Sequence, residues 1–195
     1  LRVCVGNIHW TGHSYTSLRN TFLENSKKTG AGLIEQTKQK VGIFVDVQNV
    51  YYTVKQQYSG KFDYTKFWNH ATQSRHIVTA KAYAIDRNDP KQQGFQSRLR
   101  EIGFEVCLKP FISRRDGSSK GDWDVGITID LMDFANLVDV VVLVSGDGDF
   151  DLALKKISDK FDVKTEVYGV RNLTAESLIS SADRFFPIDD NLLMQ

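Results

Sequence analysis

Two apolar runs, each followed closely by aspartate, constrain the fold of this chain more than any other feature of its sequence. Residues 41–46 read Val-Gly-Ile-Phe-Val-Asp, and residues 140–147 read Val-Val-Val-Leu-Val-Ser-Gly-Asp. Short, continuous runs of β-branched and aliphatic residues are typical of strands buried on both faces. Such strands occur in parallel sheets that helices cover on both sides, so the two runs predict an α/β fold.

The chain from residue 41 onward alternates between strand-like and helix-like segments. We expect strands at residues 41–47, 77–85, 104–111, 138–145 and 163–170, and helices at 49–58, 64–74, 91–102, 122–136, 150–160 and 173–182. This alternation predicts a three-layer α/β/α sandwich with a doubly wound parallel sheet of about five strands in the order 3-2-1-4-5. In that order strands 1 and 4 are neighbours, and a crevice opens at their carboxyl ends.

Residues 1–40 differ in composition from the body that follows them. They hold six Lys/Arg and two Glu, a balance of +4, whereas residues 41–195 hold nineteen Lys/Arg and twenty-two Asp/Glu, a balance of −3. We therefore expect an N-terminal extension over 1–40, partly helical or mobile, and one domain over 41–195. The two cysteines show no metal-ligand spacing, and no segment resembles a membrane span or a signal peptide. These features predict a cytoplasmic protein that does not enter a membrane.

Four aspartates on three separated segments are the candidate catalytic and metal-ligating residues: Asp46, Asp124, Asp147 and Asp149. Two carboxylates about 4 Å apart repel each other by roughly 4 kcal/mol at an effective dielectric near 20, so their convergence calls for a cation. Hard divalent ions such as Mg²⁺ or Mn²⁺ prefer oxygen ligands and assist reactions at phosphate. The four acids therefore predict a divalent metal site that acts on a phosphate.

The motif Ser-Gly-Asp-Gly-Asp-Phe at residues 145–150 is the sharpest in the chain. Its two glycines allow a tight turn and a close approach of the backbone to a ligand, and Asp147 and Asp149 can point into one space. A calcium loop is disfavoured because the next alternate acid and the Glu at the twelfth position are both missing. A solvated strand-to-helix turn capped by aspartate is the remaining alternative.

Four further polar residues are candidates for supporting these acids: Asn49, Ser145, Asp122 and Asp130. Asn49 is expected to orient Asp46, to hold a metal-bound water or to contact substrate, unless residues 46–49 serve only as a helix N-cap. Asp124 is expected in the first turn of a helix, where the helix dipole favours a carboxylate.

Basic and aromatic residues near the acids are the candidates for substrate binding. Lys120, Arg114 and Arg115 lie in one polar loop region and are expected to contact the phosphate backbone, with solvated loop residues as the alternative. Tyr51, Tyr52 and Trp123 are candidates for stacking on bases. For the two tyrosines, packing within a helix is the alternative.

Together these motifs resemble the NYN domain of the PIN-like nuclease superfamily, in its LabA-like bacterial branch. The resemblance covers residues 41–185 and rests on Asp46 with Asn49, Lys-Gly at 120–121 before Asp124 and Asp130, and the motif at 145–150. The chain departs from the pattern at Asp122 and Trp123, which are two residues where the family usually has one between glycine and aspartate. Asp122 is therefore a further candidate ligand.

The resemblance implies a PIN-like fold, an ion of Mg²⁺ or Mn²⁺ on the acidic cluster, and hydrolysis of RNA to 5′-phosphate and 3′-hydroxyl products. The implied partner is single-stranded RNA, bound in a salt-sensitive manner, and the oligomeric state stays open, a dimer included. One alternative is a non-catalytic or regulatory RNA-binding module. A less favoured one is a phosphatase-type phosphotransfer domain with Asp46 as nucleophile, although the expected Asp-x-Asp is Asp-Val-Gln here.

Overall fold

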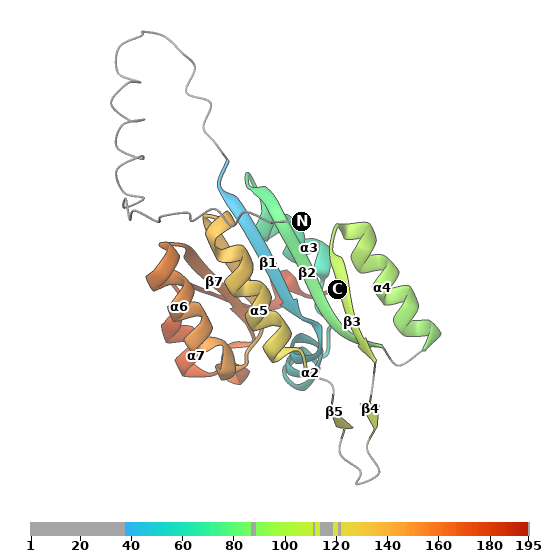
Figure 1. The fold of residues 1–195 in the computed structure, drawn as a ribbon. Helices are drawn as coiled ribbons and strands as arrows, with labels where there is room; N and C mark the ends of the chain where they lie inside the picture. Colours follow the sequence, from blue (N-terminus) through green and yellow to red (C-terminus); the bar gives the residue numbers. More distant parts are fainter. Residues whose placement is uncertain (1–37, 87–88, 111, 114–118, 121, 195) are drawn as a thin grey trace, which may run out of the picture. The chain divides into compact units, whose positions relative to one another are not determined.

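Six parallel strands form the central sheet, in the order β3-β2-β1-β6-β7-β8 (Figure 1). The structure is a computed structural model that describes residues 38–86, 89–110, 112–113, 119–120 and 122–194. The strands are β1 (Lys40–Asp46), β2 (His76–Asp86), β3 (Glu105–Pro110), β6 (Val140–Val144), β7 (Lys164–Gly169) and β8 (Arg184–Pro187). The predicted α/β class and the order of the first five strands are confirmed.

The sixth strand was not expected from the sequence. β8 pairs with the edge strand β7, and its four residues are Arg-Phe-Phe-Pro. A run this short, ending in proline, has no recognisable strand pattern, and it is extended because it pairs with an edge that is already formed. Two further short strands, β4 (Ile112–Ser113) and β5 (Ser119–Lys120), form an antiparallel pair in the region expected to be a loop.

In the described part of the chain, six α-helices connect the strands of the sheet. They are α2 (Val47–Gln57), α3 (Tyr64–Thr72), α4 (Pro90–Ile102), α5 (Asp124–Phe134), α6 (Asp151–Phe161) and α7 (Glu176–Ser181). The last of these is shorter than expected, because residues 171–173 form a separate 3-10 turn. None of the helices in the described part of the chain has the length and apolar character needed to span a lipid bilayer.

Local sequence signals account for where these helices begin and end. Asp46, Asp63 and Asp89 each accept backbone N–H bonds at the start of α2, α3 and α4, and Pro90 occupies the first turn of α4. Gly103 ends α4 with a φ of 127°, a conformation that favours glycine. These caps satisfy backbone groups that would otherwise lack partners at the helix ends.

The continuous apolar runs of β1 and β6 are explained by a core on each face of the sheet. Alternate residues of β1, among them Ile43 and Val45, pack in one cluster with side chains from α2, α3 and α4. Phe44, between them, belongs to the opposite cluster with side chains from α5, α6 and α7. Both faces of these strands are therefore buried, which favours apolar residues at successive positions.

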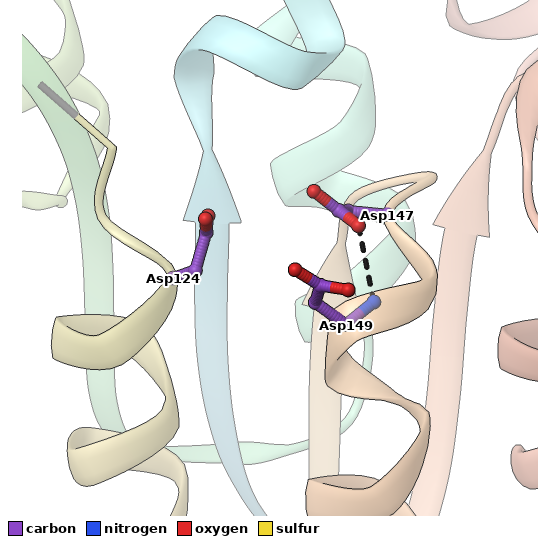
Figure 2. A group of neighbouring side chains, drawn as sticks. All are labelled: Asp124, Asp147 and Asp149. Carbon is purple, nitrogen blue, oxygen red and sulfur yellow. Dashed lines mark hydrogen bonds between the residues drawn. The ribbon is translucent and has the colours of Figure 1, made fainter. Parts of the chain in front are cut away.

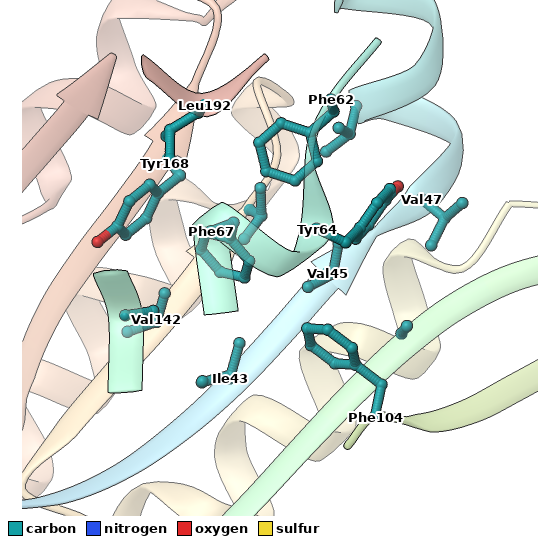
Figure 3. Packing of buried hydrophobic residues seen from close by; sticks show 14 of the residues in the cluster. Ile43, Val45, Val47, Phe62, Tyr64, Phe67, Phe104, Val142, Tyr168 and Leu192 are labelled. Carbon is teal, nitrogen blue, oxygen red and sulfur yellow. The ribbon is translucent and has the colours of Figure 1, made fainter. Parts of the chain in front are cut away.

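Aromatic side chains fill the first of these clusters (Figure 3). Phe67 on α3 is fully buried, and its ring lies 5.7 Å from that of Phe62 and 5.0 Å from that of Tyr168, measured between centroids. Replacing a buried phenylalanine of this kind with alanine typically costs about 3–5 kcal/mol. This packing holds α3 on the sheet and supports the strand edge where the predicted acids lie.

The N-terminal extension predicted from composition lies almost wholly outside the described residues. Of the predicted extension over 1–40, only residues 38–40 are described, and Lys40 already belongs to β1. The extension therefore stays a prediction.

Candidate functional site

The candidate site lies where the chain reverses direction across the sheet. β1 pairs with β6 in parallel, and Val45 is the register partner of Val144. Because the two strands run the same way, the residues that follow them, Asp46 and Ser145, emerge at the same edge of the sheet. This edge is the switch point at which open α/β sheets bind their ligands.

Three carboxylates converge at this edge (Figure 2). Asp124 is the first residue of α5, whereas Asp147 and Asp149 lie in the turn that follows β6. One carboxylate oxygen from each of the three lies within 4.8 Å of the others. The backbone N–H of Asp149 donates to the side chain of Asp147 over 3.0 Å, so the turn itself sets the spacing of its two acids.

Asp46 lies near Asp124 and Asp147, but it does not belong to the group whose carboxylate oxygens lie within 4.8 Å of one another. Its side chain is only 8% exposed, and it accepts a hydrogen bond from the backbone N–H of Asn49 over 3.1 Å. Burial, with a smaller contribution from the charges of Asp124 and Asp147, raises the pKa of Asp46 to about 6. The predicted cluster of four is therefore a group of three acids with Asp46 as an electrostatically coupled neighbour.

Asn49 and Ser145 hold the backbone of the turn that carries Asp147. The side-chain oxygen of Asn49 accepts from the N–H of Gly146 over 2.8 Å, and the buried hydroxyl oxygen of Ser145 accepts from the N–H of Asp147 over 3.2 Å. Asp46 does cap α2, as one reading of the sequence expected. The same helix turn also binds the second acidic segment, because Asn49 accepts a hydrogen bond from Gly146. These residues therefore do more than cap the helix.

Gly146 is required in this turn because another part of the backbone passes close to it. A Cβ atom at this position would lie 2.6 Å from the carbonyl oxygen of Leu173. Its own carbonyl oxygen accepts from the N–H of Ala175 over 3.0 Å. The turn that carries the acids is thus packed against the segment that follows β7.

Asp124 is surrounded by both signs of charge. Burial, followed by the charges of Asp122, Asp147 and Asp149, raises the pKa of Asp124, and Lys109 acts in the opposite direction. The ammonium of Lys109 donates to the backbone oxygen of Asp122 over 3.0 Å. Asp122 itself is exposed and lies outside the group of three.

Trp123 packs against β2 and against the side chain of Lys109. Its indole N–H donates to the carbonyl of Ala84 over 2.9 Å, and its ring lies 5.2 Å from that of Tyr83 between centroids. The Lys109 ammonium lies 4.2 Å from the centroid of the same ring. The expectation that Trp123 stacks on bases is therefore not supported, because its ring is occupied by these contacts.

Asp130 lies away from the acidic group, contrary to its expected supporting role. Its carboxylate accepts from the hydroxyl of Tyr83 over 2.6 Å and pairs with the ammonium of Lys81 over 3.0 Å. Six residues along a helix correspond to an advance of about 9 Å, which carries Asp130 away from the strand ends. Its role in this structure is to fasten α5 to the face of β2.

The predicted phosphate-binding residues cannot be placed in the same way. Arg114 and Arg115 lie outside the described residues, and for Lys120 only the backbone, in β5, is described. Their contact with substrate stays a prediction. Among the described residues, Lys109 is a basic side chain whose charge acts on Asp124.

The donor set fits a hard divalent cation. Within the described part of the chain, no ion pair joins Asp46, Asp124, Asp147 or Asp149 to a lysine or arginine. Among the described side chains, therefore, no salt bridge relieves their mutual repulsion. Carboxylate oxygens on a partly exposed edge are ligands that Mg²⁺ accepts while it keeps several waters for a phosphate to replace.

A parallel α/β sheet with carboxylates gathered at its switch point is the arrangement that the resemblance to PIN-like proteins implies. The family model of the NYN domain matches residues 40–189, and the chain belongs to the NYN domain family. It is 28% identical over 159 residues to the low amplitude and bright protein LabA of Synechococcus elongatus, covering 77% of this chain and 84% of that one.

A solved structure has the same fold. The crystal structure of a protein of unknown function from Vibrio parahaemolyticus is 55% identical to this chain, with a TM-score of 0.79. The match covers 83% of this chain and all of the other. At this identity the described fold is shared, including the parallel sheet that creates the acidic edge.

Proposed function

We propose that this protein is a metal-dependent ribonuclease that hydrolyses phosphodiester bonds of RNA. The observation that carries the proposal is the convergence of Asp124, Asp147 and Asp149, with oxygens within 4.8 Å, in a chain of the NYN family. Like charges at this spacing are tolerated when a cation lies between them, and phosphate is the substrate group that such a cation binds.

The residues of the chain have distinct parts in this proposal. Asp124, Asp147 and Asp149 would hold Mg²⁺ or Mn²⁺, which supplies charge stabilisation on the phosphate and lowers the pKa of a bound water. Asp46 adds negative charge behind them, while Asn49 and Ser145 keep the turn in position. In the reaction the water oxygen bonds to phosphorus, the bond from phosphorus to the 3′ oxygen breaks, and a proton passes to that oxygen.

The phosphotransfer alternative is not supported by the position of Asp46. A nucleophilic aspartate must present a free oxygen to the incoming phosphate. Asp46 is 8% exposed, and one of its oxygens is already bonded to the N–H of Asn49. The nuclease proposal therefore uses Asp46 as a charged neighbour of the three acids, and phosphotransfer through its other carboxylate oxygen is the less favoured alternative.

The test is incubation of the purified protein with labelled single-stranded RNA in Mg²⁺, in Mn²⁺ and in EDTA, with Asp147→Asn beside it. We expect cleavage that requires metal and is lost in Asp147→Asn, with RNA binding retained. Asp159→Asn is the matched control, because Asp159 is an exposed acid near the far end of α6. Binding without cleavage in any metal would instead indicate a non-catalytic RNA-binding module.

A second measurement tests the metal independently of turnover. A ligand that binds only the folded state stabilises it by about 2.7 kcal/mol when its concentration is one hundred times its Kd. We expect Mg²⁺ or Mn²⁺ to raise the thermal midpoint of the unchanged protein and of Asp159→Asn. The rise should be much smaller in Asp147→Asn and in Asp149→Asn.

A further inference from the structure

We infer that a groove between α2 and α4 binds the bases of the single-stranded RNA whose phosphate lies at the acidic group. The identity of the ligand rests on the proposed function, whereas the groove itself is a separate feature of the fold. It has a volume of about 700 Å³, within the range of roughly 300–1,000 Å³ that is usual for ligand pockets.

The groove begins at the edge of the sheet where the acids lie. Val47 and Gln48, which line it, follow Asp46 directly along the chain. Ala84 and Ile85 also line the groove, and they follow Tyr83, the register partner of Asp46 on β2. A strand with one phosphate at the acidic group would therefore have its neighbouring nucleotides at the mouth of the groove.

Aromatic side chains that the core leaves exposed line this groove. Tyr51 and Tyr52 on α2 are each 54% exposed, and their rings stand edge to face with centroids 5.2 Å apart. Phe95 on α4 is 36% exposed. Rings exposed to this extent in a groove offer stacking surfaces to bases, which bind aromatic faces without regard to sequence. Packing within the helix, the alternative considered for the tyrosines, is present in part, because the two rings contact each other and the Lys55 ammonium lies 5.6 Å from the centroid of the Tyr51 ring. About half of each residue nevertheless stays exposed.

The charge of the groove suits a nucleic acid strand. Lys55, Lys61 and Lys91 are lining residues, and none of the described lining residues is aspartate or glutamate. The acidic group thus stands at one end of a groove that is itself positively charged. A strand that must approach four carboxylates needs such compensation nearby, because phosphate and carboxylate repel each other.

The tyrosine pair supplies a direct test of base stacking. Affinity is measured by fluorescence anisotropy with a labelled single-stranded RNA, in an Asp147→Asn background that prevents cleavage. We expect Tyr51→Ala combined with Tyr52→Ala to weaken binding by about tenfold or more, since each stacked base contributes roughly 1–3 kcal/mol. Tyr51→Phe with Tyr52→Phe keeps the rings and should retain the affinity. An abasic strand of equal length should be insensitive to the alanine pair.

The lysines are tested through the salt dependence of the same affinity. For single strands each phosphate contact contributes about −0.7 to the slope of log K against log salt. Lys55→Gln with Lys61→Gln should make the slope shallower by about 1.4. Lys155→Gln with Lys156→Gln is the matched control, because these lysines are exposed on α6 and line no part of the groove. That control should leave the slope unchanged.

The outcomes separate the groove from the nuclease proposal. Metal-dependent cleavage together with full RNA affinity in the alanine pair would overturn the groove and leave the nuclease standing. Tyrosine-dependent affinity without cleavage in any metal would uphold the groove and overturn the nuclease. If the alanine pair abolished self-association in sedimentation and left RNA affinity unchanged, the groove would be an interface between two copies of the chain, contrary to the inference.

Discussion

The side-chain oxygen of Asn49 accepts a hydrogen bond from the backbone N–H of Gly146 over 2.8 Å, and so joins the helix after β1 to the turn after β6. These two segments are ninety-seven positions apart in the sequence. The same helix turn is bonded to Asp46, and the same loop carries Asp147. One amide side chain therefore sets how the two acidic segments lie relative to each other.

Replacing Asn49 with alanine should loosen both the fold and the metal centre. Gly146 is buried, and its N–H would lose its partner, which costs about 1–3 kcal/mol. Urea unfolding should show this loss, and a metal titration followed by thermal midpoint should show weaker binding. Gln56→Ala is the control, an exposed amide on the same helix, and its stability should change little. Equal stability in the two variants would contradict the structural role assigned to Asn49.

A matched pair of glycine substitutions tests the tight packing of the acidic turn. Gly146→Ala places a methyl group against the carbonyl of Leu173, so we expect a loss of about 1–3 kcal/mol. Gly94→Ala, in the middle of α4, meets nothing within 4 Å. Because alanine favours a helix more than glycine does, this second variant should gain about 0.5–1 kcal/mol. Chemical denaturation measures both, and the two changes should have opposite signs.

Asp46→Asn should stabilise the metal-free protein in a pH-dependent way. The pKa of Asp46 in the folded chain is about 6, above its ordinary value of 3.8, so the folded state binds its proton more tightly than the unfolded state does. Ionising the group therefore destabilises the fold by up to about 3 kcal/mol above pH 6, and this penalty disappears below about pH 4.

The measurement for Asp46→Asn is a series of thermal midpoints from pH 4 to pH 8 in EDTA. The variant should be more stable than the unchanged protein at pH 8, and the two should converge at pH 4. Added Mg²⁺ should narrow the difference at pH 8, because a cation relieves the repulsion among Asp46, Asp124 and Asp147. A variant that is less stable at every pH would show that Asp46 contributes more as the cap of α2 than it costs as a buried charge.

The ion pair of Arg75 with Glu166 should be important for stability although it lies apart from the acidic group. Two guanidinium nitrogens of Arg75 donate to the carboxylate over 2.9 and 2.7 Å, and Glu166 is only 4% exposed. Arg75→Met leaves a buried carboxylate with Arg184 at 3.9 Å as its nearest cation, so we expect a loss of about 3–5 kcal/mol.

Two further variants test whether the loss in Arg75→Met comes from the buried, unpaired charge. Arg75→Met combined with Glu166→Gln removes the buried charge as well as its partner, and should recover much of the lost stability. Glu176→Gln breaks the exposed pair with Arg171, and should cost less than about 1 kcal/mol. Urea unfolding of the three variants compares a buried pair with an exposed one in the same protein. If Arg75→Met and Glu176→Gln lowered the free energy of unfolding by similar amounts, burial would not be what makes the first ion pair important for stability.

Local patterns were sufficient to predict most of the sheet. β1 and β6 can be predicted directly from their apolar runs, because strands covered on both faces favour apolar residues at successive positions. β8 could not be read in this way, since its four residues become a strand only by pairing with β7. The shortening of α7 has the same kind of cause, as residues 171–173 turn separately before the helix begins.

The sequence by itself determined that acidic residues follow two neighbouring parallel strands, because the period and apolar character of short segments are local properties. Only the tertiary structure decided which carboxylates lie close together. It also decided that Asp130 binds Lys81 and Tyr83, and that Tyr51 and Tyr52 line a groove. Distances between separated segments depend on how helices pack on the sheet, and a shift of one helix turn, about 5.4 Å, exceeds the 4.8 Å that brings the three acids together.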